Sequence, residues 1–504
     1  MEFLTVARHG RKARQSAAAL LVGTVLAAGV ASGPARADTL REALVDAYLT
    51  NPSLQAARAQ QRATDEDVPI QRAQGLPNAS ATATHIEFLQ TSSNSFTAPE
   101  RQLQIGPDLR VPVYSGGSVR NGIKAAKERV QAGQADLRGT ESEIFSQVVA
   151  AYMDVLRNEA LVELSANQVA VLAVNLQATS DRFEIGDLTR TDVAQSQSRL
   201  AVAEGDLRNS RANLIAARED YIALVGKAPD SLEPPPPLPG LPATVGEAVV
   251  TALENNPDLI AAKERAQAAG FDSEVSGAGR LPTVGLFAGL DYTNFYGTLG
   301  GPIASNFTQK ETTANAGVQV TIPIFQGGLP AARQRQAYAR ESAALEQAIA
   351  AERNVISQVR SAYSSWQAAN AVIESSQSAV AAAELSLEGV RAENSIGNRT
   401  ILDVLNAEQE LLSARAQLVT ARRNAYVAGF SVLAAMGRAE ARDLNLDAGG
   451  PLYDPQINYE RVRGKFFDWD RDSEPAAIST RTVDIPAPDA EVAGQQDSAG
   501  EGSN

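Results

Sequence analysis

The sequence TLREALVDAYLTNPSL at residues 39–54 recurs as TVGEAVVTALENNPDL at residues 244–259, with 8 of 16 positions identical. Further along the chain, VPVYSGG at residues 111–117 returns as IPIFQGG at residues 322–328. The offset between the copies is 205 residues for the first pair and 211 for the second, a change of only six residues. A nearly constant offset of this kind indicates that a whole structural unit is duplicated.

The N-terminal residues 1–37 have the pattern of a signal peptide. Four basic residues lie between Arg8 and Arg14, residues 17–31 are largely apolar, and Ala35-Arg36-Ala37 matches an A-x-A cleavage site. We therefore expect an exported protein, with an uncleaved anchor as the alternative. The chain has no cysteine, which excludes thiol catalysis, thiolate metal sites and an acylated N-terminal cysteine.

Charge and composition narrow the class of protein further. Removing the five basic residues and one acid of residues 1–37 from the 45 and 59 of the whole chain leaves 40 basic and 58 acidic residues. A net charge of −18 argues against nucleic-acid partners, which need a concentrated basic surface. Aromatic residues make up only 5% of the chain, a composition that suits long helices packed through small side chains.

Each unit shows the same order of patterns. A short helical pattern ends at Asn51-Pro52, because proline is favoured in the first turn of a new helix, and a second helical pattern runs to about Gly75. Two stretches with alternating apolar residues follow, as in LQIGPDLRVPV at 103–113, and a period of two predicts half-buried strands. We predict strands at about 79–90 and 101–113 in the first unit, and at about 282–295 and 312–325 in the second.

Long coiled-coil helices are predicted after each pair of strands. Apolar residues recur every seven positions, for example at Val148, Val155 and Val162, and no proline interrupts residues 114–227 or 331–450. A glycine between two such runs indicates a turn between antiparallel helices, as at Gly186 and Gly397. The predicted helices span 118–185 and 188–225 in the first unit, and 329–396 and 399–437 in the second.

The predicted helices differ in length. At a rise of 1.5 Å per residue, 118–185 spans about 100 Å and 188–225 only about 57 Å. The 23 residues 52–74 supply about 35 Å more. We therefore expect the two shorter helices to stack end to end beside the long one.

These patterns divide the chain into five parts. A signal peptide at 1–37 is followed by a first repeat at 38–227, a proline-rich linker at 228–243 containing EPPPPLPGLP, and a second repeat at 244–450. Residues 451–504 carry many acidic side chains and are rich in Pro, Ala, Ser and Gly. We expect this segment to be a largely disordered tail.

Four strands with one apolar face cannot close a barrel, and an open sheet edge is not tolerated in a bilayer. Membrane barrels begin at about eight strands, so three chains that supply four strands each would reach twelve. The sequence therefore predicts an α+β membrane protein with duplicated strand hairpins and long antiparallel coiled-coil helices. As a homotrimer it would form a 12-stranded β-barrel continued by a 12-helix α-barrel.

The chain resembles the TolC family of outer-membrane efflux and type I secretion channel-tunnels up to about residue 450. The motifs that carry this resemblance are ALVDAYLTNPSL and AVVTALENNPDL, the strand ends VPVYSGG and IPIFQGG, RFEIGDLTRTDV, and NSIGNRTILDVLNAEQELLSARAQL. The resemblance implies an outer-membrane location, with the helical tube in the periplasm. It also implies a passive exit duct that contacts outer-membrane lipid and is docked by a periplasmic adaptor protein and an inner-membrane ABC, RND or MFS transporter.

The resemblance also implies functional residues at the helix turns. The family's aperture aspartates match Asp403 and Asn406, so one carboxylate is replaced by an amide here, which should weaken cation binding. The family's latch arginine matches Arg399 and its partners match Thr191 and Asp192, while the latch tyrosine position holds Asn394. The family's adaptor contacts fall on Ile185, Gly186, Leu188, Thr189, Ile396, Gly397 and Thr400.

Simpler interpretations and other classes remain open from the sequence. Asp403 could be a solvated helix charge, and the glycines could serve only as turn residues. An enzyme is the first rival class, but nothing in the sequence indicates a cofactor, a phosphate loop or a histidine cluster, and we expect no catalysis; a hydrolase with paired carboxylates is not excluded by composition. A periplasmic coiled-coil adaptor would explain the heptads but not the strands. The sequence does not separate efflux from protein secretion.

Overall fold

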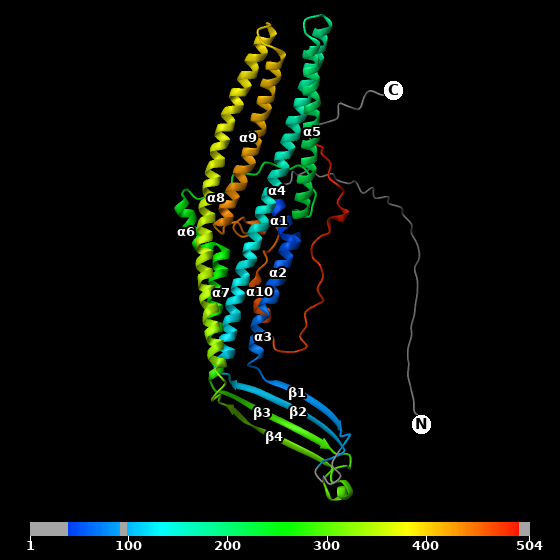
Figure 1. Cartoon of the computed structure of the whole chain (residues 1–504), viewed down its shortest axis with the longest axis vertical. Helices are drawn as coiled ribbons and strands as arrows, with labels where there is room; N and C mark the ends of the chain where they lie inside the picture. Colours follow the sequence, from blue (N-terminus) through cyan, green and yellow to red (C-terminus); the bar gives the residue numbers. More distant parts are fainter. Residues whose placement is uncertain (1–38, 91–97, 493–504) are drawn as a thin grey trace, which may run out of the picture.

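The computed structural model describes residues 39–90 and 98–492. The molecule is elongated, with a four-stranded sheet at one end and the turns of two long helix hairpins at the other (Figure 1). Among the described residues, no helix combines the length and the apolar character needed to cross a membrane.

In the described residues of the first half of the chain, there are five helices and two strands. Their bounds are α1 Leu40–Thr50, α2 Pro52–Asp65, α3 Asp67–Ala73, β1 Asn78–Glu87, β2 Arg101–Tyr114, α4 Ser118–Glu184 and α5 Arg190–Val225. The helix expected to continue to Gly75 is instead divided after Asp65. Pro69 explains this break, because it has no N–H to donate to the carbonyl of Asp65 and its ring would clash with that carbonyl.

The second half repeats this order. Its elements are α6 Val245–Asn255, α7 Pro257–Gly277, the 3₁₀ turn η1 Ala278–Arg280, β3 Thr283–Asn294, the 3₁₀ turn η2 Gly301–Asn306, β4 Lys310–Thr321, α8 Leu329–Ser395 and α9 Ile401–Ala435. Strand β4 ends at Thr321 rather than near residue 325. Pro323 accounts for the earlier end, since it cannot donate to a strand ladder.

The strands form one antiparallel sheet in the order β1-β2-β3-β4. Leu109 pairs with Ala288, which pairs with Ala316, so one face of the sheet is apolar. The neighbouring row on the opposite face holds Asp108 and Asn315, each paired with Gly289. Among the described strands, β1 and β4 each pair on one side only, so both edges of the sheet are open.

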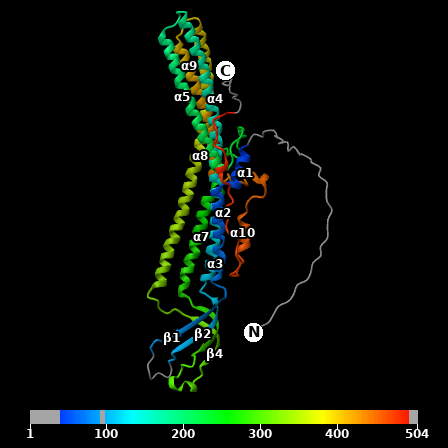
Figure 2. The same ribbon diagram turned by 90° about the vertical axis from the view of Figure 1, so that its right-hand side faces the viewer.

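The shorter helices stack end to end, as expected from their lengths. Thr50, at the end of α1, donates a hydrogen bond to the carbonyl of Val225 at the end of α5 (2.8 Å), so α2 continues the line of α5 beside α4. In the second half, Asn256 donates to the carbonyl of Ala435 (3.0 Å), so α7 continues the line of α9. The helical part is therefore a wall of long columns in which α4 lies between the two stacked pairs (Figures 1 and 2).

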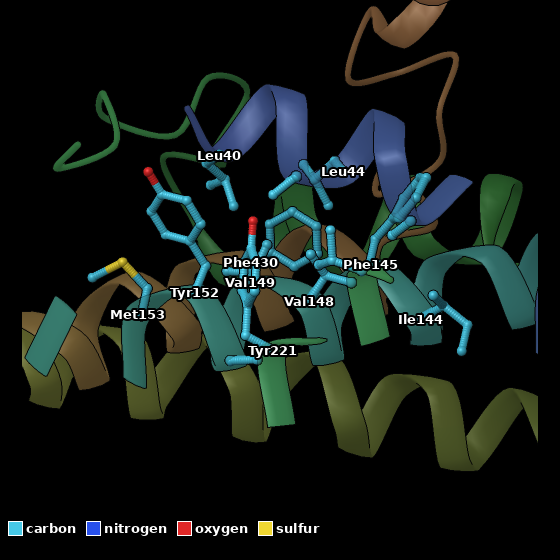
Figure 3. Packing of buried hydrophobic residues seen from close by; sticks show 14 of the residues in the cluster. Leu40, Leu44, Ile144, Phe145, Val148, Val149, Tyr152, Met153, Tyr221 and Phe430 are labelled. Atoms are coloured by element: carbon cyan, nitrogen blue, oxygen red, sulfur yellow. The ribbon is translucent and has the colours of Figure 1, made fainter. Parts of the chain in front are cut away.

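The largest buried apolar cluster lies midway along this wall. Side chains of α1, α4, α5 and α9 meet there, and Figure 3 shows Phe145 and Tyr152 of α4 packed between Leu44 of α1, Tyr221 of α5 and Phe430 of α9. Phe145 and Tyr152 are fully buried. This cluster holds the stacked helix ends against the long helix.

The expectation of a largely disordered tail is wrong for residues 451–492. Helix α10 (Pro455–Val462) packs on α2, with Asp454 as its N-cap and Val462 fully buried. A single 3₁₀ turn, η4 (Thr482–Asp484), follows. The rest of the tail is extended and ends against α5, where Arg218 bonds Asp489 at 3.0 Å (Figure 1). Residues 493–504 lie outside the described part of the chain.

Candidate functional site

The two helix hairpins end in turns built around glycine. Gly186 (φ +84°) and Gly397 (φ +81°) adopt left-handed backbone conformations, which glycine tolerates without the steric cost of a side chain. Both turns lie at the same end of the molecule (Figure 1). Next to them, Ile185 is 80% exposed and Ile396 is 72% exposed, so each tip presents an apolar side chain to solvent.

The same capping arrangement begins the second helix of each hairpin. The hydroxyl of Thr189 accepts from the backbone N–H of Asp192, whose carboxylate accepts from the N–H of Thr189 at 2.9 Å. Thr400 and Asp403 repeat this reciprocal pair, with 3.0 Å between the Thr400 nitrogen and the Asp403 carboxylate. These capping boxes explain why α5 begins at Arg190 and α9 at Ile401, two residues later than expected.

The capping bonds also set the charge of both acids. Hydrogen bonds from Thr189 lower the pKa of Asp192, and hydrogen bonds from Thr400 lower the pKa of Asp403. Both carboxylates are therefore ionised at neutral pH. The residue matched to the aperture and the residue matched to the latch thus have the same local environment in their own hairpins.

The latch residues pair within their own hairpin in this chain. The guanidinium of Arg399 bonds Glu393 at 2.7 Å, and the amide of Asn394 donates to the carbonyl of Arg399 at 2.8 Å. Within the described chain, no hydrogen bond or ion pair joins Arg399 to Thr191 or Asp192, which lie on the other hairpin. The hydrogen bond from Asn394 to the carbonyl of Arg399 closes the turn between α8 and α9.

Asn406 connects the two hairpins. Its side-chain oxygen accepts a hydrogen bond from Arg199 of α5 at 2.9 Å. The residue immediately before Asn406 in α9, Leu405, is 2% exposed and packs against Leu172 of α4 and Ala203 of α5. The first part of α9 is therefore seated against the first hairpin by one polar and one apolar contact.

A buried carboxylate that the sequence analysis missed strengthens this contact. Glu408 of α9 is 3% exposed and accepts two hydrogen bonds from the amide of Asn175 on α4, at 2.9 and 3.0 Å. Arg391 of α8 reaches the same carboxylate at 3.0 Å. A sequence signal was available, because Glu408 lies four residues after Val404 and three before Leu411, on the apolar stripe of α9. An acid in that position needs partners when it is buried.

A second charged contact joins the hairpins nearer the middle of the wall. Arg423 of α9 forms two hydrogen bonds with Asp154 of α4, at 2.7 and 3.1 Å. Glu408 and Asp154 thus bind α9 to the first hairpin at two levels. These two contacts hold the two hairpins of one chain together, whereas the residues at the tips stay exposed.

The chain matches the family described as "Outer membrane efflux protein" over residues 43–227 and 248–438. It is 33% identical to the outer membrane efflux protein BepC of Brucella suis biovar 1 (strain 1330), over 90% of this chain and 95% of that protein. It is 28% identical to the alkaline protease secretion protein AprF of Pseudomonas aeruginosa PAO1, over 62% of this chain and 65% of AprF.

Solved structures share the fold. The outer membrane protein VceC of Vibrio cholerae superposes with a TM-score of 0.67, covering 79% of this chain and 96% of VceC at 23% identity. The resemblance to TolC-type channels inferred from the sequence motifs is thereby confirmed. The chain belongs to the outer membrane efflux protein family.

Proposed function

We propose that three copies of this protein form the outer-membrane exit duct of an export system. The observation that carries the proposal is the sheet at one end of the helical wall, which has one apolar face and two open edges. An open edge is not stable in lipid because its N–H and carbonyl groups find no water there. The family membership supports an outer-membrane location, where pairing β4 of one chain with β1 of the next removes every edge.

In a trimer, the number of strands and the number of helical columns are both twelve. Three sheets of this kind give a barrel of about twelve strands, within the range of membrane barrels. In this trimer the apolar face that includes Leu109 and Ala316 meets lipid, and the face that includes Asp108 and Asn315 lines water. The helical wall continues the barrel into the periplasm as a twelve-column tube, because each chain supplies two long helices and two stacked pairs.

The hairpin turns form the closed end of the tube in this proposal. Asp403 rings the aperture with one carboxylate per chain, and Asn406 adds an amide that bonds Arg199 of its own chain. Arg399 exchanges its Glu393 partner for Thr191 and Asp192 of a neighbouring chain when the latch is closed. Glu408 and Asp154 hold the two hairpins of one chain together, so opening requires either these bonds or the contacts between chains to break.

The exposed tips provide the docking surface for a partner. Ile185 and Ile396 project from the turns with most of their surface in solvent, which suits apolar contact with a periplasmic adaptor. The remaining adaptor-contact residues in the proposal surround them: Gly186, Leu188, Thr189, Gly397 and Thr400. An inner-membrane transporter would act through that adaptor. A role as a periplasmic adaptor is less favoured for this chain, because that role does not explain the four-stranded sheet.

Both efflux and protein secretion fit this architecture. BepC is named as an efflux protein and AprF as a protease secretion protein, and this chain is similar to both. The phenotype of a gene deletion distinguishes a small-molecule cargo from a protein cargo. We expect raised sensitivity to detergents and hydrophobic drugs if the cargo is small, and retention of a substrate protein if the cargo is a polypeptide. A soluble monomer in the periplasmic fraction would contradict the channel function altogether.

A further inference from the structure

The tail turns back at residues 464–471, which read GKFFDWDR and are called the aromatic loop below. Phe466 is 63% exposed, Phe467 is 71% exposed and Trp469 is 85% exposed. The whole chain has only two tryptophans and 13 phenylalanines, so three such side chains within four positions form a local concentration. Large aromatic side chains left together in water are typical of a binding surface.

Ion pairs at its base hold the aromatic loop in shape. Lys465 bonds Asp470 at 3.1 Å, and Asp472 bonds both Lys465 at 3.4 Å and Arg461 at 2.7 Å. The rings of Phe466 and Phe467 contact each other, with 4.1 Å between their centroids. The charged groups thus pair with one another at the base, while the three aromatic side chains stay largely exposed. A preformed loop loses little conformational entropy when it binds.

The aromatic loop lies beside the junction between the helical wall and the sheet. Arg72, one residue before the end of α3, donates a hydrogen bond to the carbonyl of Arg463 at 3.2 Å. Strand β1 begins only six residues after Arg72, at Asn78. In Figure 1 the turn of the tail lies next to α3 and just before the sheet, at the end of the wall opposite the hairpin tips.

The adjoining end of the sheet carries exposed apolar residues at the same level. The register of β2 shifts between Pro112 and Tyr114, which places Tyr114 opposite Val284 on the apolar face. Tyr114 is 48% exposed, and Phe325, just beyond β4, is 88% exposed. Membrane barrels carry aromatic residues at this level, where the hydrocarbon meets the headgroups. The aromatic loop continues that level from the sheet onto the tail.

We propose that the aromatic loop rests on the periplasmic leaflet of the outer membrane, with Phe466, Phe467 and Trp469 among the lipid headgroups. This inference rests on the proposed function, since it requires the sheet to lie in the bilayer. Lipid is the occupant that the position favours, because the loop lies beside the junction between the helical wall and the sheet and far from the tips proposed for the adaptor (Figure 1). The chain has no cysteine to carry an acyl chain, so the loop supplies a peripheral membrane contact by side chains alone.

Tryptophan fluorescence of the full-length protein tests this contact. Trp366→Phe leaves Trp469 as the only tryptophan of the chain. The variant is reconstituted into vesicles of phosphatidylethanolamine and phosphatidylglycerol with brominated acyl chains. We expect the brominated lipid to quench most of the Trp469 emission, and the same lipid without bromine to protect it from aqueous iodide. Full quenching by iodide with no quenching by brominated lipid would overturn the proposal.

Two control positions separate this inference from the proposed function. In a chain that also carries Trp469→Phe, Val318→Trp reports on the apolar face of β4, and Leu286→Trp, its partner on β3, replaces it if that variant does not assemble. Val202→Trp on α5 reports on the exposed helical wall. We expect lipid quenching at the sheet and none at Val202→Trp. Quenching at the sheet but not at Trp469 overturns the loop contact alone, and quenching at neither overturns both proposals.

Discussion

The side-chain amide of Asn51 donates a 2.9 Å hydrogen bond to the main-chain carbonyl of Leu224, although 173 residues separate them. The oxygen of the same side chain accepts from the N–H groups of Ser53 and Leu54, and so caps α2. One buried asparagine therefore completes the start of α2 and the end of α5 together. Asn256 repeats this arrangement: it caps α7 and donates to the carbonyl of Ala435 at the end of α9. Each Asn-Pro dipeptide therefore joins two helices end to end into one column.

Replacing Asn51 with alanine should destabilise the protein through both lost contacts. The N-cap is worth about 1 kcal/mol, and a buried carbonyl left without its donor costs about 1–3 kcal/mol more. We expect Asn51→Ala to lower the free energy of unfolding by about 2–4 kcal/mol, measured from the midpoint and slope of a urea unfolding titration in detergent. Asn51→Ser keeps a capping oxygen but cannot reach Leu224, so it should lose only part of that stability; equal losses for both variants would contradict the shared role.

Removing the Glu408 carboxylate should loosen the hairpins of one chain. Glu408→Ala leaves the amide of Asn175 and the guanidinium of Arg391 without their shared acceptor. We expect the variant to show a larger and noisier single-channel conductance in planar bilayers, and cells that carry it to become sensitive to large hydrophilic antibiotics. Glu408→Gln, which keeps one acceptor oxygen, should have a smaller effect.

A surface ion pair provides the matched control for Glu408. Glu384 of α8 bonds Arg415 of α9 at 2.8 Å within the second hairpin, but both side chains are about half exposed. Exposed pairs contribute only about 0–1 kcal/mol. Glu384→Ala should therefore leave conductance and antibiotic sensitivity unchanged. If the two alanine variants behave alike, the buried Glu408 contact does not hold the hairpins closed.

Asp403→Ala should reduce the block of channel current by multivalent cations, because it removes the ring of carboxylates proposed for the aperture. Since Asp403 also caps α9, loss of the cap alone could disturb the tip. Asp192→Ala supplies the comparison, because it removes the equivalent capping carboxylate from α5. Only the Asp403 variant should change the concentration of cation that halves the current. Block that is equal in the wild type and Asp403→Ala would exclude Asp403 from the pore.

The carboxyl group of Glu141 should make stability depend on pH. Burial raises the pKa of Glu141 to about 7, although a hydrogen bond from the backbone N–H of Ala441 opposes the shift. The charged or titratable groups that face it come from α1, α2 and the segment after α9: Tyr48, Arg58, Glu440 and Arg442. The folded protein therefore binds a proton more tightly than the unfolded chain does.

Stability should fall as pH rises from about 4.5 to about 7, because unfolding releases the Glu141 proton in this window. The shift corresponds to at most about 3 kcal/mol. Glu141→Gln keeps an oxygen for the Ala441 N–H and removes the charge. We expect this variant to lose that part of the pH dependence and to be more stable than the wild type at pH 8 in urea titrations. A variant whose stability follows the wild-type pH profile would show that Glu141 does not titrate in this range.

Much of the fold could be predicted because the heptad repeats and the alternating strand patterns extend over long stretches of the sequence. Heptads and alternating strands depend on many residues, so no single side chain decides them. Single residues decided the differences: Pro69 divides a helix, Pro323 ends β4, and Thr189 and Thr400 set where two helices begin. The order of the tail could not be predicted from its composition, because it depends on contacts with α2 and α5 more than two hundred residues away.

The candidate site was predicted less completely than the fold. The motif resemblance identified Asp403 and Asn406 but not the partners that they have within the chain. The position of Glu408 on the apolar stripe of α9 signalled a buried acid, but its partner Asn175 lies 233 residues earlier and no local pattern links the two. The pairing of Arg399 with Glu393 could not be foreseen either, since a residue in an exposed turn has several acids within reach.

In the proposed assembly, β4 of one chain pairs with β1 of the next until three chains close a barrel. The chain has no native cysteine, so Ala81→Cys on β1 combined with a scan of single cysteines along β4 gives a clean background. Outer membranes are treated with a short bismaleimide, and the products are separated under denaturing conditions. At one level of β4 we predict a ladder of covalent products that ends at three chains. A ladder that stays at one chain at every position, or that continues beyond three, would contradict a closed three-chain barrel.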